Sequence, residues 1–384
     1  MDNDRIYNLT EVSNGKALLL LPVSILAAIL MLLGIVGNTA VITVIWKRMP
    51  KNAINSFILT LAMFDLFSCV ACSPLDIVEL RYPHEFPIPG LCKLLRFART
   101  LSTSSSGFLL IAIATERYRL ICKYKKSHMS ASQAWKTCGV IFVVATVIST
   151  PSVVLFGSKT VALQGGLNGT ECSISDSYKG SIFPVLFYSL LIFLFFGTFI
   201  SLCVLYAFVG IQIWKGRKIR TKRFSSMSAL SRDTVNAALN NTLEALEFPC
   251  DSLKRTTSFF GERAQKAKEY SRRRTTLIMV AITSVFLTSC LPYIIVAICR
   301  FLIKDIDSYL TETGEVFFHF SLKSFMFSPV LNPYIYGYCN ERFKRELLKL
   351  AIVKTIQKKL QKGDNSDTSQ SPTYSAANND EVDK

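Results

Sequence analysis

Long stretches of this sequence contain no charged residue. Only 18% of its 384 residues are Asp, Glu, Lys or Arg, whereas 50% are hydrophobic. Residues 17–46 include none of the four charged types. A soluble protein of this length carries more charge and spreads its apolar residues along amphipathic stripes. The scarcity of charge therefore excludes an ordinary soluble globular domain.

Histidine is also scarce, and the residues that catalysis uses are scattered. The three histidines, His84, His128 and His319, lie far apart, and no metal-ligand or nucleophile spacing accompanies them. We therefore expect neither an enzyme nor a resident cofactor. Internal repeats and polar faces along several helices are not visible, which argues against a transporter or channel. The first apolar run is too long for a signal peptide and lacks a cleavage pattern, so we interpret it as a span.

Seven apolar stretches are long enough to cross a bilayer as helices, at about 1.5 Å per residue. They cover residues 17–46, about 54–75, about 92–121, 137–157, 181–214, 275–299 and about 316–338. The second, third and seventh contain charged residues, which inside a membrane usually face the bundle and have a function. We expect an all-α integral membrane protein, a seven-transmembrane helix bundle.

The net charge of +17 lies in alternate connections between these stretches. Basic residues gather after the first, third, fifth and seventh spans, and the other connections are balanced or acidic. This positive-inside pattern, unlike a nucleic-acid-binding patch, places the N-terminus outside the cell and the C-terminus in the cytoplasm of a plasma-membrane protein. The sequons at Asn8 and Asn168 fall on outer segments and are expected to be glycosylated, whereas the one at Asn240 is cytoplasmic and should be unused.

Two of the eleven cysteines face the oxidising side of the membrane. Cys92 opens the third span, and Cys172 lies in the outer loop between the fourth and fifth. A disulfide between them is favoured, and would tie that loop to the top of the third helix.

The flanking segments differ in character from the spans. We expect an extracellular N-terminus at 1–16, a membrane domain at 17–339, an amphipathic eighth helix at 340–354 on the inner leaflet, and a disordered cytoplasmic tail at 355–384. The third cytoplasmic loop, about 215–271, should extend the fifth and sixth helices around a less ordered middle near Pro249 and Cys250.

One carboxyl group lies in the middle of the second span. Asp65 would cost several kcal/mol there without partners. Candidate partners at similar depth are Asn38, Ser106, Ser328 and Asn332. A carboxylate among neutral oxygens suits Na⁺ or a proton. The alternative is a protonated, purely structural Asp.

The third span ends in Glu116-Arg117-Tyr118. The neighbouring opposite charges can hold each other at rest, and release of Arg117 would expose a docking point. Taken alone, the pair is better explained as ordinary side chains at a helix end that reach toward the membrane surface.

Together these motifs resemble rhodopsin-like (class A) G-protein-coupled receptors. The matching residues are Gly37-Asn38, Leu61 to Asp65, Cys92, Glu116-Arg117-Tyr118, Asn332-Pro333-Tyr334-Ile335-Tyr336 and Phe343, in this order and on these spans. The resemblance covers nearly the whole chain outside the third cytoplasmic loop and the tail.

The resemblance implies a role for each matching position. Asp65, Ser106, Ser328 and Asn332 match the family's allosteric sodium site. Arg117 would be the switch that meets a heterotrimeric G protein, and arrestin and receptor kinases would be further partners. The inward-turning tyrosines are matched by Tyr206 and Tyr336, and the activation pivot by Phe286, Cys290 and Pro292.

Three positions depart from the family pattern. Cys290 replaces the sixth-helix tryptophan, Thr198 replaces the fifth-helix proline, and Arg272 stands where some members carry an acid that pairs with the third-helix arginine. We therefore expect a less rigid toggle and some constitutive activity.

The ligand class is indicated only by charge. Arg99 stands where amine receptors carry an aspartate, which disfavours an ammonium ligand. Arg99, Arg300 and Lys323 suggest a ligand pocket for an anion, but Asp76 and Glu79 could be their internal partners instead. A peptide, as for a neuropeptide receptor, is favoured by the mixed outer charges, and a lipid acid or small anionic metabolite is the alternative.

Overall fold

The computed structural model describes residues 8–122, 129–163, 166–241, 252–303 and 306–350, and the side chains of these residues except those of 216–273, 301, 307 and 308. The helices are α1 (Leu9–Leu19), α2 (Leu21–Arg48), α3 (Ala53–Phe67), α4 (Ser73–Arg81), α5 (Pro89–Ile121), α6 (Ala131–Leu155), α7 (Phe183–Asn241), α8 (Ser252–Leu302), α9 (Glu312–Leu322) and α10 (Phe327–Cys339). The predicted tail at 355–384 and the loop middle around Pro249 and Cys250 lie outside the described residues.

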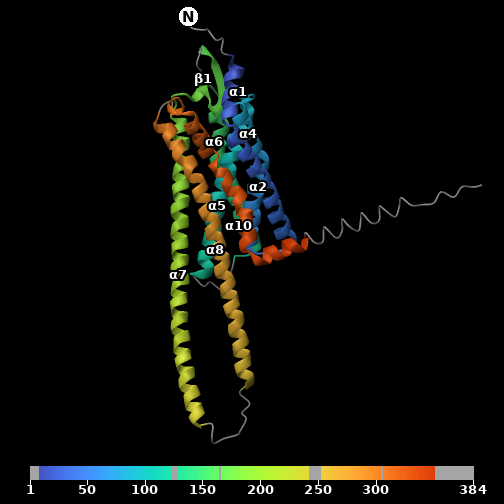
Figure 1. Cartoon of the computed structure of the whole chain (residues 1–384), viewed down its shortest axis with the longest axis vertical. Coiled ribbons are helices and arrows are strands. Elements are labelled where there is room, and N and C mark those ends of the chain that lie inside the picture. The colour runs from blue at the N-terminus through green and yellow to red at the C-terminus, as the bar shows by residue number, and fades with distance from the viewer. Residues whose placement is uncertain (1–7, 123–128, 164–165, 242–251, 304–305, 351–384) are drawn as a thin grey trace, which may run out of the picture.

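Among the described residues, six crossings are made by helices long and apolar enough to span a membrane. They cover Leu21–Arg48, Ala53–Arg81, Pro89–Ile121, Ala131–Leu155, Phe183–Lys215 and Arg274–Arg300, each overlapping one predicted span. The longest helices, α7 and α8, continue below the bundle (Figure 1). These continuations are the predicted extensions of the fifth and sixth helices into the third cytoplasmic loop.

The seventh crossing is an interrupted helix. Residues predicted as one span at 316–338 form α9, a short 3-10 segment η5 (Ser324–Met326), and α10. The α-helix stops at Lys323, whose φ of −101° and ψ of 3° lie outside the α region. Each α-helical piece alone is too short to cross a bilayer, and together they complete the predicted seven-helix bundle.

The second crossing contains a π-helical turn. Residues Ser68–Cys72 (η1) join α3 to α4, and Pro74 follows at the start of α4. A π turn adds a residue to one helical turn and so re-aims the side chains beyond it. It begins three residues after Asp65 and ends four residues before Asp76, the two acids expected to have a function.

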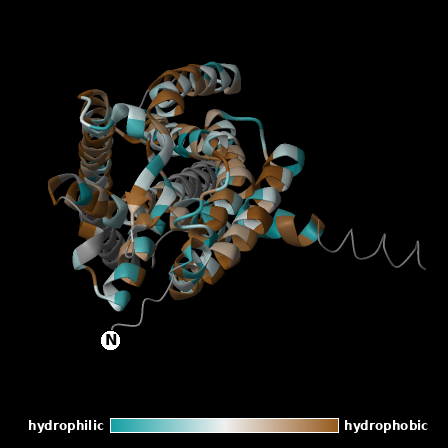
Figure 2. Cartoon of the chain, turned by 90° about the horizontal axis from the view of Figure 1, so that it is seen from above, coloured by the Kyte–Doolittle hydropathy of each residue, from teal (hydrophilic) through white to brown (hydrophobic). Residues whose placement is uncertain are grey.

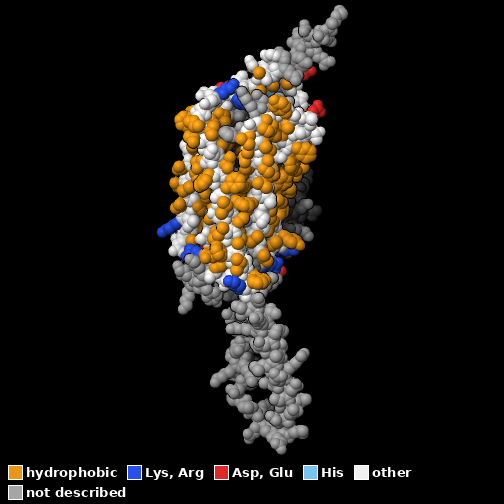
Figure 3. Space-filling view, turned by 90° about the vertical axis from the view of Figure 1, so that its left-hand side faces the viewer, with side chains coloured by type: hydrophobic (Ala, Val, Ile, Leu, Met, Phe, Trp, Pro, Cys, Tyr) orange, Lys and Arg blue, Asp and Glu red, His pale blue; other side chains and the backbone are white. Residues whose placement is uncertain are grey.

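Large apolar side chains are exposed along the bundle. Phe193, Val36 and Val147 are about two-thirds exposed or more. Hydrophobic side chains cover the face seen in Figure 3, with basic side chains along its lower edge. Seen from above, most helices of the bundle carry long stretches of hydrophobic residues (Figure 2). Such a surface is stable only when a bilayer covers it.

The end of the bundle that the sequence predicts to lie outside the cell, called the extracellular end below, carries structure that the sequence did not predict. Helix α1 is capped by the Asn8 side chain and crosses the expected boundary at residue 17. An antiparallel hairpin of β1 (Phe156–Ala162) and β2 (Asn168–Ile174) lies beside it at the upper end (Figure 1). The backbone N–H of Thr170 donates to the His84 carbonyl, and that of Phe86 donates to the Thr170 carbonyl, which attaches the 82–88 connection to this hairpin.

The opposite end of the bundle carries the short helix expected after the last span. Residues 341–350 are helical and run across the end of the bundle (Figure 1). Phe343 is buried against Tyr336, with ring centroids 5.0 Å apart, while Leu347 and Leu348 remain exposed. The predicted continuation to 354 lies outside the described residues.

Candidate functional site

The predicted disulfide between Cys92 and Cys172 is present and joins β2 to the first turn of α5. Its two Cα atoms are 5.3 Å apart. The backbone carbonyl of Cys172 also accepts a hydrogen bond from Arg96 at 2.9 Å. The hairpin is therefore fixed over the third crossing by one covalent bond and one hydrogen bond.

Five ionisable side chains meet beneath this hairpin, and we call them the extracellular charge cluster. They are Asp76 and Glu79 from α4, Arg96 and Arg99 from α5, and Lys323 at the end of α9. Lys323 donates to Asp76 at 2.9 Å and to Glu79 at 2.5 Å. Arg99 pairs with the other oxygen of Asp76, and Arg96 with the other oxygen of Glu79.

The two ends of the cluster differ in exposure. Arg99 donates to Ser68 at 2.9 Å, and its guanidinium lies 4.2 Å from the centre of the Phe325 ring. Its side chain is 14% exposed, whereas those of Arg96 and Glu79 are 26% and 21% exposed. Arg96 lies one turn nearer the extracellular end of α5. A ligand that enters from outside would thus meet Arg96 before Arg99.

The pairing of Arg99 and Lys323 with Asp76 and Glu79, one of the two alternatives read from the sequence, is what the structure shows. Arg300 lies elsewhere, exposed at the end of α8, 5.1 Å from the Phe318 ring. The sequence interpretation missed the role of Arg96. The sequence pattern that could have revealed it is a matched spacing on neighbouring helices. The acids Asp76 and Glu79 are three residues apart, and so are the bases Arg96 and Arg99.

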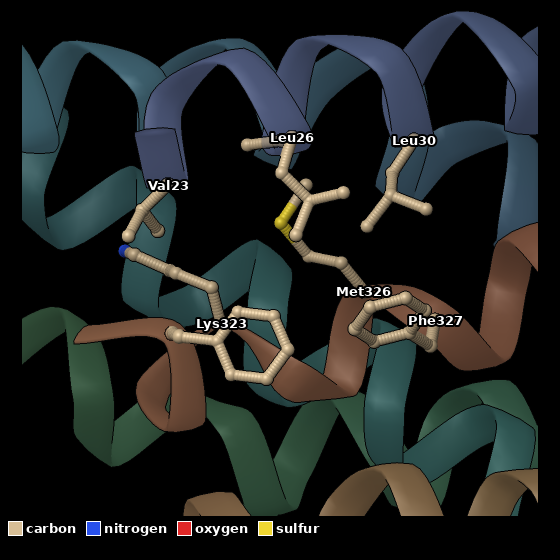
Figure 4. Close-up of a pocket in the computed structure, with 8 residues that line it drawn as sticks. Val23, Leu26, Leu30, Lys323, Met326 and Phe327 are labelled. Carbon is tan, nitrogen blue, oxygen red and sulfur yellow. The ribbon is translucent and has the colours of Figure 1, made fainter. Parts of the chain in front are cut away.

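A small apolar hollow adjoins the cluster between the first and seventh crossings. It is lined by Val23, Leu26, Ala27, Leu30, Phe320, Lys323, Met326 and Phe327. The aliphatic stem of Lys323 crosses this hollow, and its nitrogen lies beside Val23 (Figure 4). Lys323 thus packs its apolar stem between the first and seventh crossings and places its charged end among the acids.

The second buried acid, Asp65, lies deeper and has neutral neighbours. It is 2% exposed and accepts a hydrogen bond from Asn332 at 2.9 Å. Ser106 and Ser328, the other predicted oxygen donors, are also buried. Asn38 instead donates to the Gly34 and Pro329 carbonyl oxygens.

Asp65 and Asn332, with the buried Ser106 and Ser328 as candidate further donors, have the chemistry that suits a small hard cation. The side-chain carbonyl oxygen of Asn332 is buried without a hydrogen-bond partner among the described residues. A carboxylate, an amide oxygen and hydroxyl groups are the oxygen ligands that such a cation accepts. Elsewhere in the described part of the chain, no group of three or more His, Cys, Asp or Glu side chains is placed to hold a metal ion.

The predicted switch residues Glu116 and Arg117 lie at the end of the third crossing that the sequence predicts to be cytoplasmic. Glu116 and Arg117 are 3% and 5% exposed. Glu116 accepts a hydrogen bond from the Met129 backbone and lies 3.8 Å from Arg119. Tyr206 on α7 shares a 3.2 Å hydrogen bond with Thr283 on α8. The expected ion pair between Glu116 and Arg117 stays a prediction. The side chain of Arg272 is not among those that the structure describes.

The predicted pivot lies where the sixth crossing meets the third and seventh. Phe286 and Cys290 are buried in the main core, and Pro292 lies inside α8. A side chain at Gly107 on α5 would contact the Phe286 ring at 3.4 Å. The backbone carbonyl of Ser289 accepts a hydrogen bond from Ser324 in η5 at 2.7 Å. A movement of the sixth crossing at the pivot would therefore displace the interrupted seventh crossing through this hydrogen bond.

Both predicted glycosylation sites are exposed at the extracellular end. Asn168 begins β2, and Asn8 precedes α1. The Asn8 side-chain oxygen accepts a hydrogen bond from the Thr10 backbone. The amide nitrogen, to which a glycan would be attached, is not used in that bond.

Comparison with known proteins agrees with this arrangement. Residues 37–336 match the family model of the 7 transmembrane receptor (rhodopsin family). The cholecystokinin receptor of Xenopus laevis is 24% identical over 84% of this chain and 75% of its own length. The human cholecystokinin receptor type A is 24% identical over 90% of this chain and 83% of its own length. A C3a anaphylatoxin chemotactic receptor of Oncorhynchus mykiss is 26% identical over 50% and 54%.

The family match spans most of the chain, including the buried acid, the Glu-Arg-Tyr end of α5 and the Asn-Pro segment of α10. With seven crossings and a disulfide-tethered outer hairpin, this chain belongs to the rhodopsin family of seven-transmembrane receptors.

Proposed function

We propose that this receptor binds an extracellular peptide and activates a heterotrimeric G protein. The observation that carries the proposal is the family match, together with relatives whose names refer to cholecystokinin, C3a and neuropeptide Y, all peptides. The charge cluster beneath the tethered hairpin supports it, because acids and bases at one site suit a ligand with several polar groups. The chain then acts as a receptor with no catalysis of its own.

The orientation follows from charge and chemistry. We infer an extracellular N-terminus and a cytoplasmic C-terminus in the plasma membrane. The positive-inside distribution supports this, and so does the disulfide, which requires an oxidising compartment. The exposed sequons at Asn8 and Asn168 lie at that same end.

Signal transfer is proposed to run through Arg117. A buried arginine at the cytoplasmic end of α5 is a charged donor that can be released when neighbouring helices shift. Tyr206 and Tyr336, from α7 and α10, would then turn toward it. Arrestin and receptor kinases are the further cytoplasmic partners that we propose.

Sodium is proposed as an allosteric ligand of the resting state. The carboxylate of Asp65, the free amide oxygen of Asn332, and the hydroxyl groups of Ser106 and Ser328 would hold it. The bound charge would offset the cost of an ionised acid in the membrane interior. Helix movements that separate these residues would release the ion.

A cell-based screen tests the peptide assignment. Cells expressing the receptor with a promiscuous G protein receive a synthetic peptide library and, separately, a library of small carboxylates and lipid acids. We expect calcium responses to peptides in these cells and none in cells expressing Arg117→Ala at equal surface density. Responses confined to the carboxylate and lipid-acid library would contradict the peptide assignment.

A further inference from the structure

We propose that Arg96 is the recognition point for an acidic group of the ligand, an oxyanion that completes the extracellular charge cluster. This inference rests on the proposed function as a peptide receptor. It differs from the expectation read from the sequence, which placed the anion on Arg99, Arg300 and Lys323.

The first step is the charge of the cluster. Asp76 and Glu79 contribute two negative charges, and Arg96, Arg99 and Lys323 contribute three positive ones. Each of the four carboxylate oxygens already contacts one of these cations. One positive charge is therefore in excess inside the outer half of the bundle, where uncompensated charge is costly.

The second step is to find which cation can accept a partner. Lys323 is 9% exposed and is held by both acids. Arg99 is enclosed by Asp76, Ser68 and the Phe325 ring. Arg96 is the most exposed of the three cations, and among the described residues only its Nη2 is engaged, by Glu79 and the Cys172 carbonyl.

The third step is the set of donors that remain on Arg96. The Nε atoms of Arg96 and Arg99 both lie buried with no hydrogen-bond partner in the part of the chain that the structure describes. Arg96 differs in its Nη1, which donates no hydrogen bond to a described residue, whereas both Nη atoms of Arg99 donate, to Ser68 and Asp76. A guanidinium presents planar pairs of N–H groups that match the two oxygens of a carboxylate. Tyr188 and Tyr293 lie close enough to interact electrostatically with it, and the Phe156 ring lies 5.6 Å away. An oxyanion here would satisfy the spare donors and neutralise the excess charge.

A measurement without any ligand tests the charge argument. Arg96→Gln leaves two acids against two bases, so the purified receptor should melt at the wild-type temperature or above it. Glu79→Gln raises the excess to two positive charges and should lower the melting temperature. Lys93→Gln is the matched control, because it removes a base one turn away on α5. If the melting temperature of Arg96→Gln proves lower than that of Glu79→Gln, the charge cluster carries no excess positive charge.

A second measurement identifies the source of the oxyanion. The probes are matched synthetic peptide libraries with aspartate or asparagine at one position, each made with a free C-terminal carboxylate and with a C-terminal amide. If the oxyanion is an aspartate side chain, replacing it with asparagine should abolish the response. If the oxyanion is the C-terminal carboxylate, amidation should abolish the response. In either case Arg96→Gln should reduce potency about tenfold or more, the range expected for losing a charge-assisted hydrogen bond, and Lys93→Gln should not.

The outcomes separate this inference from the proposed function. Active peptides that keep full potency with both asparagine and an amidated terminus would overturn the oxyanion and leave the peptide receptor standing. Activity of glutarate or fatty acids alone, sensitive to Arg96→Gln, would overturn the peptide assignment and leave the oxyanion site standing. Equal potency at wild type and Arg96→Gln would overturn the site itself.

Discussion

At the scale of single residues, two buried acids of the second crossing have different surroundings. Asp76 contacts two cations, whereas the hydrogen bond to Asp65 comes from the neutral amide of Asn332. The sequence predicted the burial of Asp65 and its possible partners, since a lone acid in an apolar run has few alternatives. It did not predict that Arg96 would be the accessible base. That depends on Phe325 covering Arg99, a contact between residues more than two hundred positions apart.

Sodium should stabilise the receptor through Asp65. Replacing choline with sodium at constant ionic strength should raise the melting temperature of the purified receptor. The expected gain is about 1.4 kcal/mol at a sodium concentration ten times the Kd. Asp65→Asn should remove this gain, because the amide contributes no charge to the cation. A sodium effect of equal size in that variant would place the ion elsewhere.

Acid should loosen the outer hairpin through Glu171 on β2. Burial opposes its ionisation, but the imidazole of His84, 3.2 Å away, and the charge of Lys16 hold the pKa of Glu171 below its ordinary 4.5. The carboxylate therefore stabilises the folded hairpin above about pH 4.5, and this contribution is lost as the pH falls through the lowered pKa.

The comparison of wild type with Glu171→Gln checks this prediction. The wild type should melt at a higher temperature at pH 6, and the difference should vanish as the pH falls below 4.5. A difference that persists unchanged at pH 3 would show that the carboxylate charge is not responsible.

At the scale of elements, the sequence predicted the crossings but not their interruptions. Charge-free runs of sufficient length have one stable arrangement in a bilayer, so the spans follow from composition. The π turn at Ser68–Cys72 and the break at Lys323 depend on contacts with other helices. Ser68 accepts a bond from Arg99, and Lys323 donates to two acids on α4. Such contacts between distant segments are not visible in local sequence patterns.

Close helix packing leaves no room for a side chain at Gly34 and Gly37 of α2, and the contact at Gly37 is the more rigid of the two. A Cβ at Gly37 would lie 2.7 Å from Cγ of Pro333, whose ring cannot move aside. Gly37→Ala should therefore lower the free energy of unfolding by about 1–3 kcal/mol, the usual cost of overpacking.

Gly139 on α6 is the matched control, because a Cβ there meets nothing within 4 Å. Gly139→Ala should change stability by no more than about 0.5 kcal/mol. Both variants can be compared by thermal unfolding of the purified receptor. Equal losses in the two would mean that α2 and α10 do not pack as closely as described.

At the scale of the whole molecule, three polar layers lie along the bundle. The charge cluster lies at the outer end, Asp65 in the middle and Arg117 at the cytoplasmic end. The π turn connects the first two, since Ser68 bonds Arg99 and follows Asp65 by three residues. Ser324 connects the interrupted seventh crossing to the sixth. A ligand that changes the outer layer could thereby act on the inner one through packed helices with two arrangements.

The proposed signalling role is tested most directly by nucleotide exchange on a purified heterotrimeric G protein. Full-length receptor in lipid nanodiscs, with the pooled synthetic peptides, should accelerate the exchange of GDP for GTPγS above empty nanodiscs. Arg117→Ala should reduce that acceleration about tenfold or more, as expected for loss of a buried charged contact, while its melting temperature stays near that of the wild type. Undiminished exchange with Arg117→Ala, or no acceleration of any heterotrimer by the wild type, would contradict the account.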